Sequence, residues 1–123
     1  VYVASMLNGD AVAEEIKKNH PDETVVLICS GSAGRFNLED FYGAGYFIDC
    51  LVARAGDDTD LTDAARTALY FYRGNSDDPA EMLAQSKVGK MLSRFGFRED
   101  IRFVSQRGIF PVVPYLNGST VVL

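Results

Sequence analysis

The chain has 123 residues, of which 47% are hydrophobic and 24% are charged, and this ordinary globular composition argues against a disordered or fibrous chain. Twelve Lys and Arg against seventeen Asp and Glu leave a net charge of −5, which disfavours a nucleic-acid partner because phosphate backbones are repelled. No apolar run approaches the ~20 residues that span a bilayer, and no signal peptide is recognisable. We therefore expect a cytoplasmic protein with no membrane partner.

The first third of the chain predicts a strand, a helix and a second strand. Residues 1–7 are apolar and rich in β-branched side chains, which is typical of a strand. An amphipathic pattern follows Asn8 and should end near Pro21, because a proline disfavours helix at the residue before it. Residues 24–29 form a continuous apolar run, which predicts a strand buried on both faces.

The middle of the chain predicts helices. Three are expected: 38–54, 61–72 and a stretch from 79 to 96. Asn37 should cap the first of them, and Asp78 should cap the third with Pro79 at the first helical position. Gly89 is a place where the third helix could break or bend.

The last quarter predicts strands again. Residues 101–105 alternate between apolar and polar side chains, residues 110–115 are extended but interrupted by prolines, and Asn117 with Gly118 indicates a hairpin turn before a last strand over 119–123. The order of elements predicts one α/β unit over residues 1–123, with a three-layer α/β/α architecture and a mixed, largely parallel sheet.

A small-residue turn between the second expected strand and the next helix is the most informative motif. Glycines at Gly31 and Gly34 let the backbone approach an anion, Ser30 and Ser32 can donate hydroxyl hydrogen bonds, and Arg35 can donate two parallel ones. Phosphate, sulfonate or carboxylate is the expected ligand. The turn lacks the Gly-Lys-Ser/Thr of a Walker A loop. A turn that is rich in glycine for steric reasons alone is the alternative.

The acidic and amide side chains near this turn can each be interpreted in two ways, as helix-capping groups or as ligands. Glu39 and Asp40 open the next helix, where they complement the helix dipole or, alternatively, hold Mg²⁺ between carboxylate and phosphate oxygens. Asn8 follows the first expected strand as Ser30 follows the second, so it could bind the same ligand or simply cap a helix.

Histidine and cysteine chemistry is sparse. His20, the single histidine, precedes a proline and is expected at the surface, which disfavours a His-based triad or zinc site within this chain. Cys29 and Cys50 have no metal-ligand spacing and are expected to be small buried side chains in a reducing compartment.

Several segments together carry a resemblance to a known family. They are Ser5–Asn8, Ile28–Gly31 with Gly34–Arg35, Leu38–Asp40 with Gly43–Gly45, Ser86–Leu92, Gly96, Asp100–Ile101 and Val113–Pro114. The chain resembles the 2-phosphosulfolactate phosphatase family along nearly its whole length, but only the C-terminal half of that family's sequence. The family's N-terminal half, with its Asp-x-x-Arg-Ala and Gly-Glu-Arg type motifs, is absent, and Val88 stands where the family often has a His.

The resemblance implies a Mg²⁺-dependent acid phosphatase that hydrolyses 2-phosphosulfolactate, a small polyanionic substrate, to sulfolactate and phosphate. In methanogens this step belongs to coenzyme M biosynthesis. Glu39 and Asp40 would be the catalytic and metal-binding carboxylates, beside the substrate-binding turn. The expected partners are the N-terminal half of the same protein and a second copy of the chain in a homo-oligomer. Two alternatives stay open: a non-catalytic anion-binding or assembly portion whose partner half carries the chemistry, and a metal-free small-molecule module.

Overall fold

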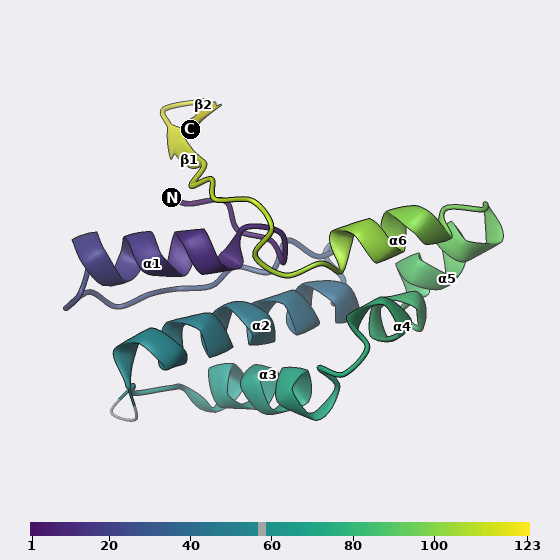
Figure 1. Ribbon diagram of the computed structural model, residues 1–123, viewed down its shortest axis with the longest axis horizontal. Helices are drawn as coiled ribbons and strands as arrows, with labels where there is room; N and C mark the ends of the chain where they lie inside the picture. The colour runs from purple at the N-terminus through teal and green to yellow at the C-terminus, as the bar shows by residue number, and fades with distance from the viewer. Residues whose placement is uncertain (57–58) are drawn as a thin grey trace.

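The computed structural model describes residues 1–56 and 59–123, and Figure 1 shows how their helices are grouped. Within these residues there are six α-helices and one two-stranded sheet: α1 (Gly9–Asn19), α2 (Leu38–Ala55), α3 (Asp63–Gly74), α4 (Pro79–Ala84), α5 (Lys87–Arg94), α6 (Arg98–Val104), β1 (Tyr115–Asn117) and β2 (Thr120–Val122). The helices α1, α2 and α3 pack one against the next, while α4, α5 and α6 form a second group at one end of α2.

The first three helices lie where the sequence predicts them. On α1, Val12, Ala13 and Ile16 are buried at helical spacing, and two lysines complement the dipole in its last turn. The start of α3 is fixed by Thr62, whose hydroxyl accepts a hydrogen bond from the Ala65 N–H at 3.2 Å. These two helices therefore follow from local sequence signals alone.

The expected helix over 79–96 is instead two short helices. Asp78 caps α4 as predicted, since its carboxylate accepts a hydrogen bond from the Glu81 N–H at 3.0 Å. The break falls at Ser86, whose hydroxyl accepts from the Gly89 N–H at 2.9 Å and so begins α5. Any Cβ on Gly89 would overlap the Leu83 carbonyl, so this glycine lets α5 approach α4 closely.

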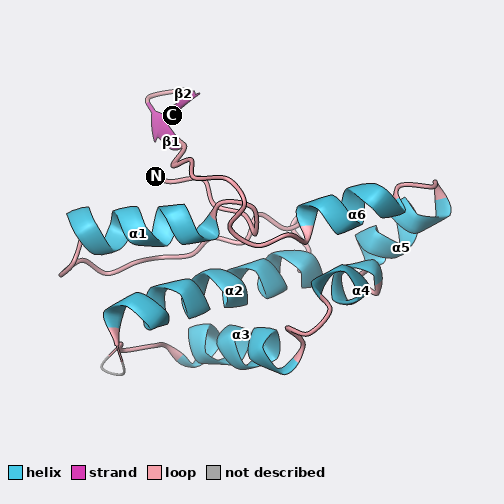
Figure 2. Ribbon diagram, in the orientation of Figure 1, coloured by secondary structure: helices cyan, strands magenta, loops and turns pink. Residues whose placement is uncertain are grey.

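The predicted three-layer α/β/α architecture with a mixed, largely parallel sheet is wrong. Figure 2 shows helices joined by loops, and the one sheet in the described residues is the antiparallel pair β1–β2. Residues 1–7 contribute a single bridge from Tyr2 to Tyr115, and residues 24–29 pair with nothing in the described chain. Both segments have strand-like sequences, but a strand joins a sheet only when a neighbour supplies the other half of each hydrogen bond.

Residues 101–105, predicted as a strand, are instead the last four residues of α6 and its C-cap, Ser105. Ile101 and Ser105 are the buried positions and lie four residues apart, whereas Phe103 is exposed. The apparent alternation is therefore one face of a helix, because a spacing of four residues satisfies both patterns in so short a window. The hairpin at the end of the chain is confirmed: Asn117 pairs with Thr120, which leaves Gly118 and Ser119 as the two-residue turn.

The core lies between the first three helices. Its buried hydrophobic side chains are Met6, Val12, Ala13, Ile16, Tyr42, Tyr46, Phe47, Ile48, Cys50, Ala68, Leu69 and Tyr72. Gly45 of α2 sits against the Ala68 carbonyl and the Tyr72 side chain of α3, with no room for a Cβ. The buried faces are thus helix against helix. None of the helices in the described part of the chain is long and apolar enough to cross a membrane.

Candidate functional site

The predicted anion-binding turn is a tight reversal of the backbone between residues 32 and 35. The Ser32 N–H donates to the Arg35 carbonyl at 3.1 Å, and the Arg35 N–H donates back to the Ser32 carbonyl at 3.0 Å. The two residues between them have positive φ angles, 51° at Ala33 and 71° at Gly34, which is the conformation of a type I′ turn. Ala33 has a side chain in this left-handed region, at a cost of about 1–2 kcal/mol.

The Asp40 carboxylate reaches back from the first turn of α2 to the start of this turn. Its Oδ2 accepts a hydrogen bond from the Gly31 N–H at 2.6 Å and a longer one from the Ser30 hydroxyl at 3.4 Å. The Cys29 thiol lies 3.6 Å from the Asp40 carbonyl oxygen and donates to it. The chain's own carboxylate therefore occupies the donors that the sequence assigns to an anion, through a single carboxylate oxygen.

Ser32 and Arg35 complete the polar part of the turn. The Asn37 amide donates to the Ser32 hydroxyl at 2.9 Å, so Asn37 occupies the N-cap position of α2 without making the expected side-chain cap. Arg35 is exposed, and its guanidinium makes no hydrogen bond or ion pair within the described residues. Residues 32–36 are therefore open to solvent, and within the described residues the Arg35 guanidinium is unpaired.

Asn8 is placed differently from the sequence expectation. Its side chain is buried, with 6% of the residue exposed, and it makes no cap to α1 although it stands at the N-cap position. Its amide donates to the carbonyl oxygens of Val3 and Val112 and accepts from the N–H and hydroxyl of Ser5. Each polar atom of the side chain is thus engaged by the protein, and a ligand could bind Asn8 only by displacing one of these contacts.

Glu39 and Asp40 do not face the same point. Adjacent residues of a helix leave it about 100° apart, so only the Asp40 carboxylate turns toward the Gly31 N–H. Among residues 1–56 and 59–123 no group of three or more His, Cys, Asp or Glu side chains is close enough to hold a metal ion. Mg²⁺ commonly takes one or two carboxylates and fills its other positions with water and phosphate oxygens. Asp40 fits one such position, and a complete protein cage is not present.

The two cysteines differ in their surroundings. Cys29 is exposed, contrary to the prediction, because the segment that carries it is not covered by a sheet. Partial burial of the thiol and the nearby Asp40 charge raise the pKa of Cys29 above its usual value, so it is a neutral thiol at pH 7. Cys50 is buried as predicted, and burial raises its pKa to about 11. Neither thiol is poised as a nucleophile.

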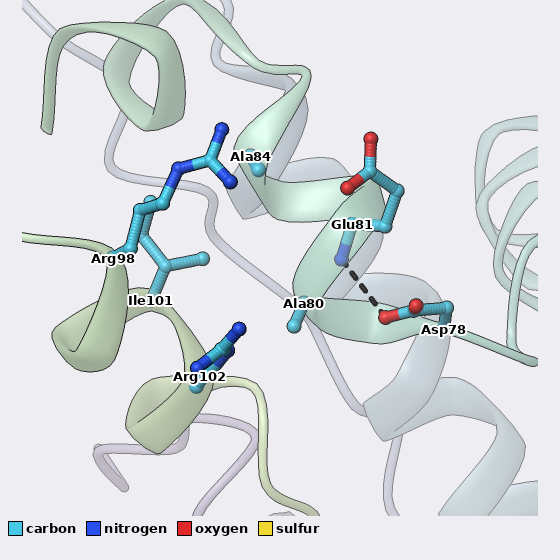
Figure 3. A pocket seen from close by; sticks show the side chains of 7 residues that line it. All are labelled: Asp78, Ala80, Glu81, Ala84, Arg98, Ile101 and Arg102. Carbon is cyan, nitrogen blue, oxygen red and sulfur yellow. Dashed lines mark hydrogen bonds between the residues drawn. The ribbon is translucent and has the colours of Figure 1, made fainter. Parts of the chain in front are cut away.

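A surface hollow of about 150 Å³ between α4 and α6 is a feature that the sequence reasoning missed (Figure 3). Arg98 and Arg102 project into it from α6, opposite Glu81 and Asp78. Arg102 is paired with Glu99 at 2.6 Å. Two arginines against two acids leave the hollow without excess positive charge, so it offers little to a polyanion.

A second hollow, of about 550 Å³, lies beside the end of α1 and includes Tyr2, Glu15 and His20 in its lining. The Tyr2 hydroxyl lies 2.9 Å from His20 Nε2, and His20 Nδ1 lies 3.0 Å from a Glu23 carboxylate oxygen. The imidazole therefore fastens the first residues of the chain to the end of α1. This role is structural, and no pattern in the sequence around His20 predicted it.

Comparisons with known proteins identify the family. The sequence profile of the family described as 2-phosphosulpholactate phosphatase matches residues 1–119. A relative from Clostridium acetobutylicum is 36% identical over 119 residues, which are 96% of this chain and 49% of the relative. A relative from Thermotoga petrophila is 33% identical over 123 residues, which are 100% of this chain and 51% of the relative. Both carry the name probable 2-phosphosulfolactate phosphatase.

The matches cover different shares of this chain and of its relatives. The chain spans about half the length of the curated relatives it matches, while nearly all of its own residues are covered. The matched region includes the turn at residues 32–35 and the Asp40 carboxylate. The chain therefore belongs to the 2-phosphosulfolactate phosphatase family.

Proposed function

We propose that this chain is part of a phosphatase that hydrolyses 2-phosphosulfolactate to sulfolactate and phosphate, and that it supplies the substrate-binding turn around residues 30–35. In that reaction water adds to phosphorus, the P–O bond to the sulfolactate oxygen breaks, and the leaving oxygen takes up a proton. The observation that carries the proposal is the hydrogen bond of 2.6 Å from the Gly31 N–H to the Asp40 carboxylate, because a backbone N–H that holds a carboxylate oxygen could hold a phosphoryl oxygen in its place. Family membership supports the choice of substrate.

The proposed substrate contacts come from the turn. The Ser30 and Ser32 hydroxyls and the backbone at Gly31 and Gly34 would donate to phosphoryl or sulfonate oxygens, and Arg35 would pair with one of these anionic groups. Asn8 is retained as a further contact only if one of its present partners is released. A phosphoryl group at Gly31 would compete with Asp40, so the carboxylate must turn aside or share a cation with the substrate.

Magnesium dependence is part of this proposal. Asp40 would supply a carboxylate oxygen, with water and substrate oxygens at most of the remaining positions, and Glu39 would join it only if its side chain turned toward the same ion. A bound Mg²⁺ ion would neutralise charge on the phosphoryl group. The residues of this chain orient the substrate and hold its anionic groups at the turn, and positioning together with charge stabilisation is the main source of rate in phosphoryl transfer.

A second candidate function follows from the length of the relatives. Because the chain corresponds to about half of them and its described residues contain no three-ligand metal cluster, it could be an anion-binding or assembly portion whose partner half carries the chemistry. In that case the turn binds the substrate without hydrolysing it. The two functions differ in one measurable property, which is turnover by the chain alone.

The test is an assay of the isolated chain with 2-phosphosulfolactate and Mg²⁺, combined with calorimetric binding of inorganic phosphate and sulfolactate. Phosphate release that falls at least tenfold in Asp40→Asn, less in Glu39→Gln and not in Asp63→Asn supports the catalytic proposal. Asp63 is the matched control because it is an acid in the first turn of α3. Binding without turnover favours the second candidate. Wild-type activity and Mg²⁺ affinity in both Asp40→Asn and Glu39→Gln would refute the metal assignment.

A further inference from the structure

The connection between α1 and α2 contains an unpaired, strand-like segment, residues 24–29. Figure 1 shows it running back along α1 without helical coils. Across these six residues no backbone N–H or carbonyl makes a backbone hydrogen bond to any other described residue. The sequence, Thr-Val-Val-Leu-Ile-Cys, contains no charge, proline or glycine. It is therefore an open row of donors and acceptors on an apolar stretch of chain.

The segment contacts the core on one side. Leu27 packs against both hydrophobic clusters of the core, so one face is seated on the helices. Val26 and Ile28, on either side of Leu27, are 74% and 86% exposed. Val25 and Cys29, which share the side of Leu27 in an extended chain, are also exposed, although Val25, at 39%, is less exposed than Val26 and Ile28. Among the described residues, Leu27 is therefore the one contact that seats this segment on the core. The helices thus hold the segment in place, but they leave its outer face and its backbone uncovered.

An uncovered strand edge of this kind is unusual for an isolated protein. Natural edges are blunted by charged side chains, prolines, bulges or a covering element, because an open edge pairs with any suitable strand. None of these devices is present within residues 24–29. The edge has the properties of a site for strand addition, in which backbone hydrogen bonds provide affinity and alternate side chains provide specificity.

We infer that residues 24–29 are the docking edge for an apolar strand from the complementary half of the family's polypeptide. The relatives contain about as many residues again outside the matched region, so each copy of this segment in those proteins is accompanied by an equal length of further chain. A second copy of this chain is a poorer occupant, because each copy carries a net charge of −5 and two would repel. The inference rests on family membership and does not depend on the catalytic proposal.

The test measures binding in the absence of substrate and metal. The probe is the half of the Clostridium acetobutylicum relative that this chain does not match, produced as a separate polypeptide and mixed with the full 123-residue chain. Size-exclusion chromatography with light scattering gives the stoichiometry, and amide hydrogen exchange locates the contact. We expect a one-to-one complex in which the amides of residues 25–28 become protected from exchange. The double variant V26D/I28D should weaken the complex at least tenfold.

Phe95 provides the matched control, since it is 73% exposed and lies at the end of α5, away from residues 24–29. F95D should leave the complex unchanged, and circular dichroism should show equal helix content in all variants. Absence of a complex overturns the inference, as does protection confined to other residues. A dimer of this chain that V26D/I28D dissociates, with no binding of the probe, also overturns it, because the occupant is then a second copy. If the complex forms but releases no phosphate when 2-phosphosulfolactate and Mg²⁺ are then added, that result would contradict only the proposed function.

Discussion

At the scale of single residues, the Asp40 carboxylate and the Arg35 guanidinium define the electrostatics of the turn. Asp40 is held by the Gly31 N–H, whereas Arg35 has no partner in the described chain. A polyanion would meet one favourable and one unfavourable charge on approach. The balance between them decides whether the turn binds phosphate unaided or only with a cation, and each side chain can be tested separately.

Removal of Arg35 should weaken anion binding. In Arg35→Ala the lost charge-assisted hydrogen bonds are worth about 1.5–3 kcal/mol, so the dissociation constant for inorganic phosphate, and KM where turnover is seen, should rise roughly 10- to 100-fold. Arg66→Ala, at an exposed position of α3, is the control and should leave both unchanged. Isothermal titration measures the difference. An unchanged dissociation constant in Arg35→Ala would remove this residue from the site.

Asp10 links acid stability to the packing of α1 on α2. Burial opposes ionisation of Asp10, but hydrogen bonds from the Tyr46 hydroxyl at 3.0 Å and the Arg54 guanidinium at 3.0 Å lower its pKa below the usual value of 3.8. A lowered pKa means that the ionised form stabilises the folded state above about pH 4, and this contribution is lost as pH falls through the folded-state pKa.

Asp10→Asn should therefore lower the free energy of unfolding at pH 7 and flatten its decline below pH 4. Urea denaturation at several pH values measures both effects. Glu14→Gln is the control: Glu14 also pairs with Arg54, at 3.1 Å, but its side chain is more exposed, and its loss should have a smaller effect. Equal acid sensitivity of Asp10→Asn and the wild type would show that this carboxylate makes no contribution.

At the scale of elements, the contact of α2 with α3 depends on the absence of a side chain at Gly45. Gly43, two residues earlier on the same helix, has open space around it. Gly45→Ala should destabilise the fold by about 1–3 kcal/mol or more through overpacking, whereas Gly43→Ala should be neutral or stabilise it by up to about 1 kcal/mol. Thermal unfolding of both variants tests this, and equal melting temperatures would contradict the packing described here.

Local signals in the sequence predicted α1, α2, α3 and the terminal hairpin. They did not predict the separation of α4 from α5 or the helical state of residues 101–104, and they wrongly predicted a largely parallel sheet. The cap at Asp78 and the hairpin turn at Gly118 act within a few residues, so a sequence pattern reveals them. Strand pairing depends on a neighbour that no local pattern specifies, and for residues 24–29 the described chain holds no such neighbour. The window 101–105 was too short to separate a period of two from a helical period.

The candidate site was also predicted only in part. Residue types and spacing indicated that Ser30, Gly31 and Asp40 belong to one anion-binding turn, and the structure brings these three together. Spacing could not reveal that Asp40 itself fills the turn, because this depends on the direction in which α2 leaves it. The burial of Asn8 was also hidden, since two of its partners come from Val112 and Val3, which only tertiary folding places beside it.

At the scale of the whole molecule, the net charge of −5 opposes a polyanionic substrate at long range. Binding must then rely on charge neutralisation close to the turn. We expect Mg²⁺ and phosphate together to raise the melting temperature more than the sum of either alone, because a ligand that binds only the folded state stabilises it. Chelation of Mg²⁺ should abolish the cooperative part. A shift with phosphate that is independent of Mg²⁺ would favour the metal-free alternative.

The buried amide of Asn8 connects parts of the chain that are 104 residues apart in sequence, since one side chain grips the backbone at both Val3 and Val112. The backbone continues this seam, with Val3 bonded to Pro114 and Leu116 bonded to Val1. These hydrogen bonds hold residues 1–3 and residues 112–116 together beside the start of α1. A truncation that removes residues from 112 onward would leave the buried Asn8 amide without one of its acceptors. It would also remove the backbone hydrogen bonds that hold residues 1–3, so a change at one end of the chain would destabilise the other.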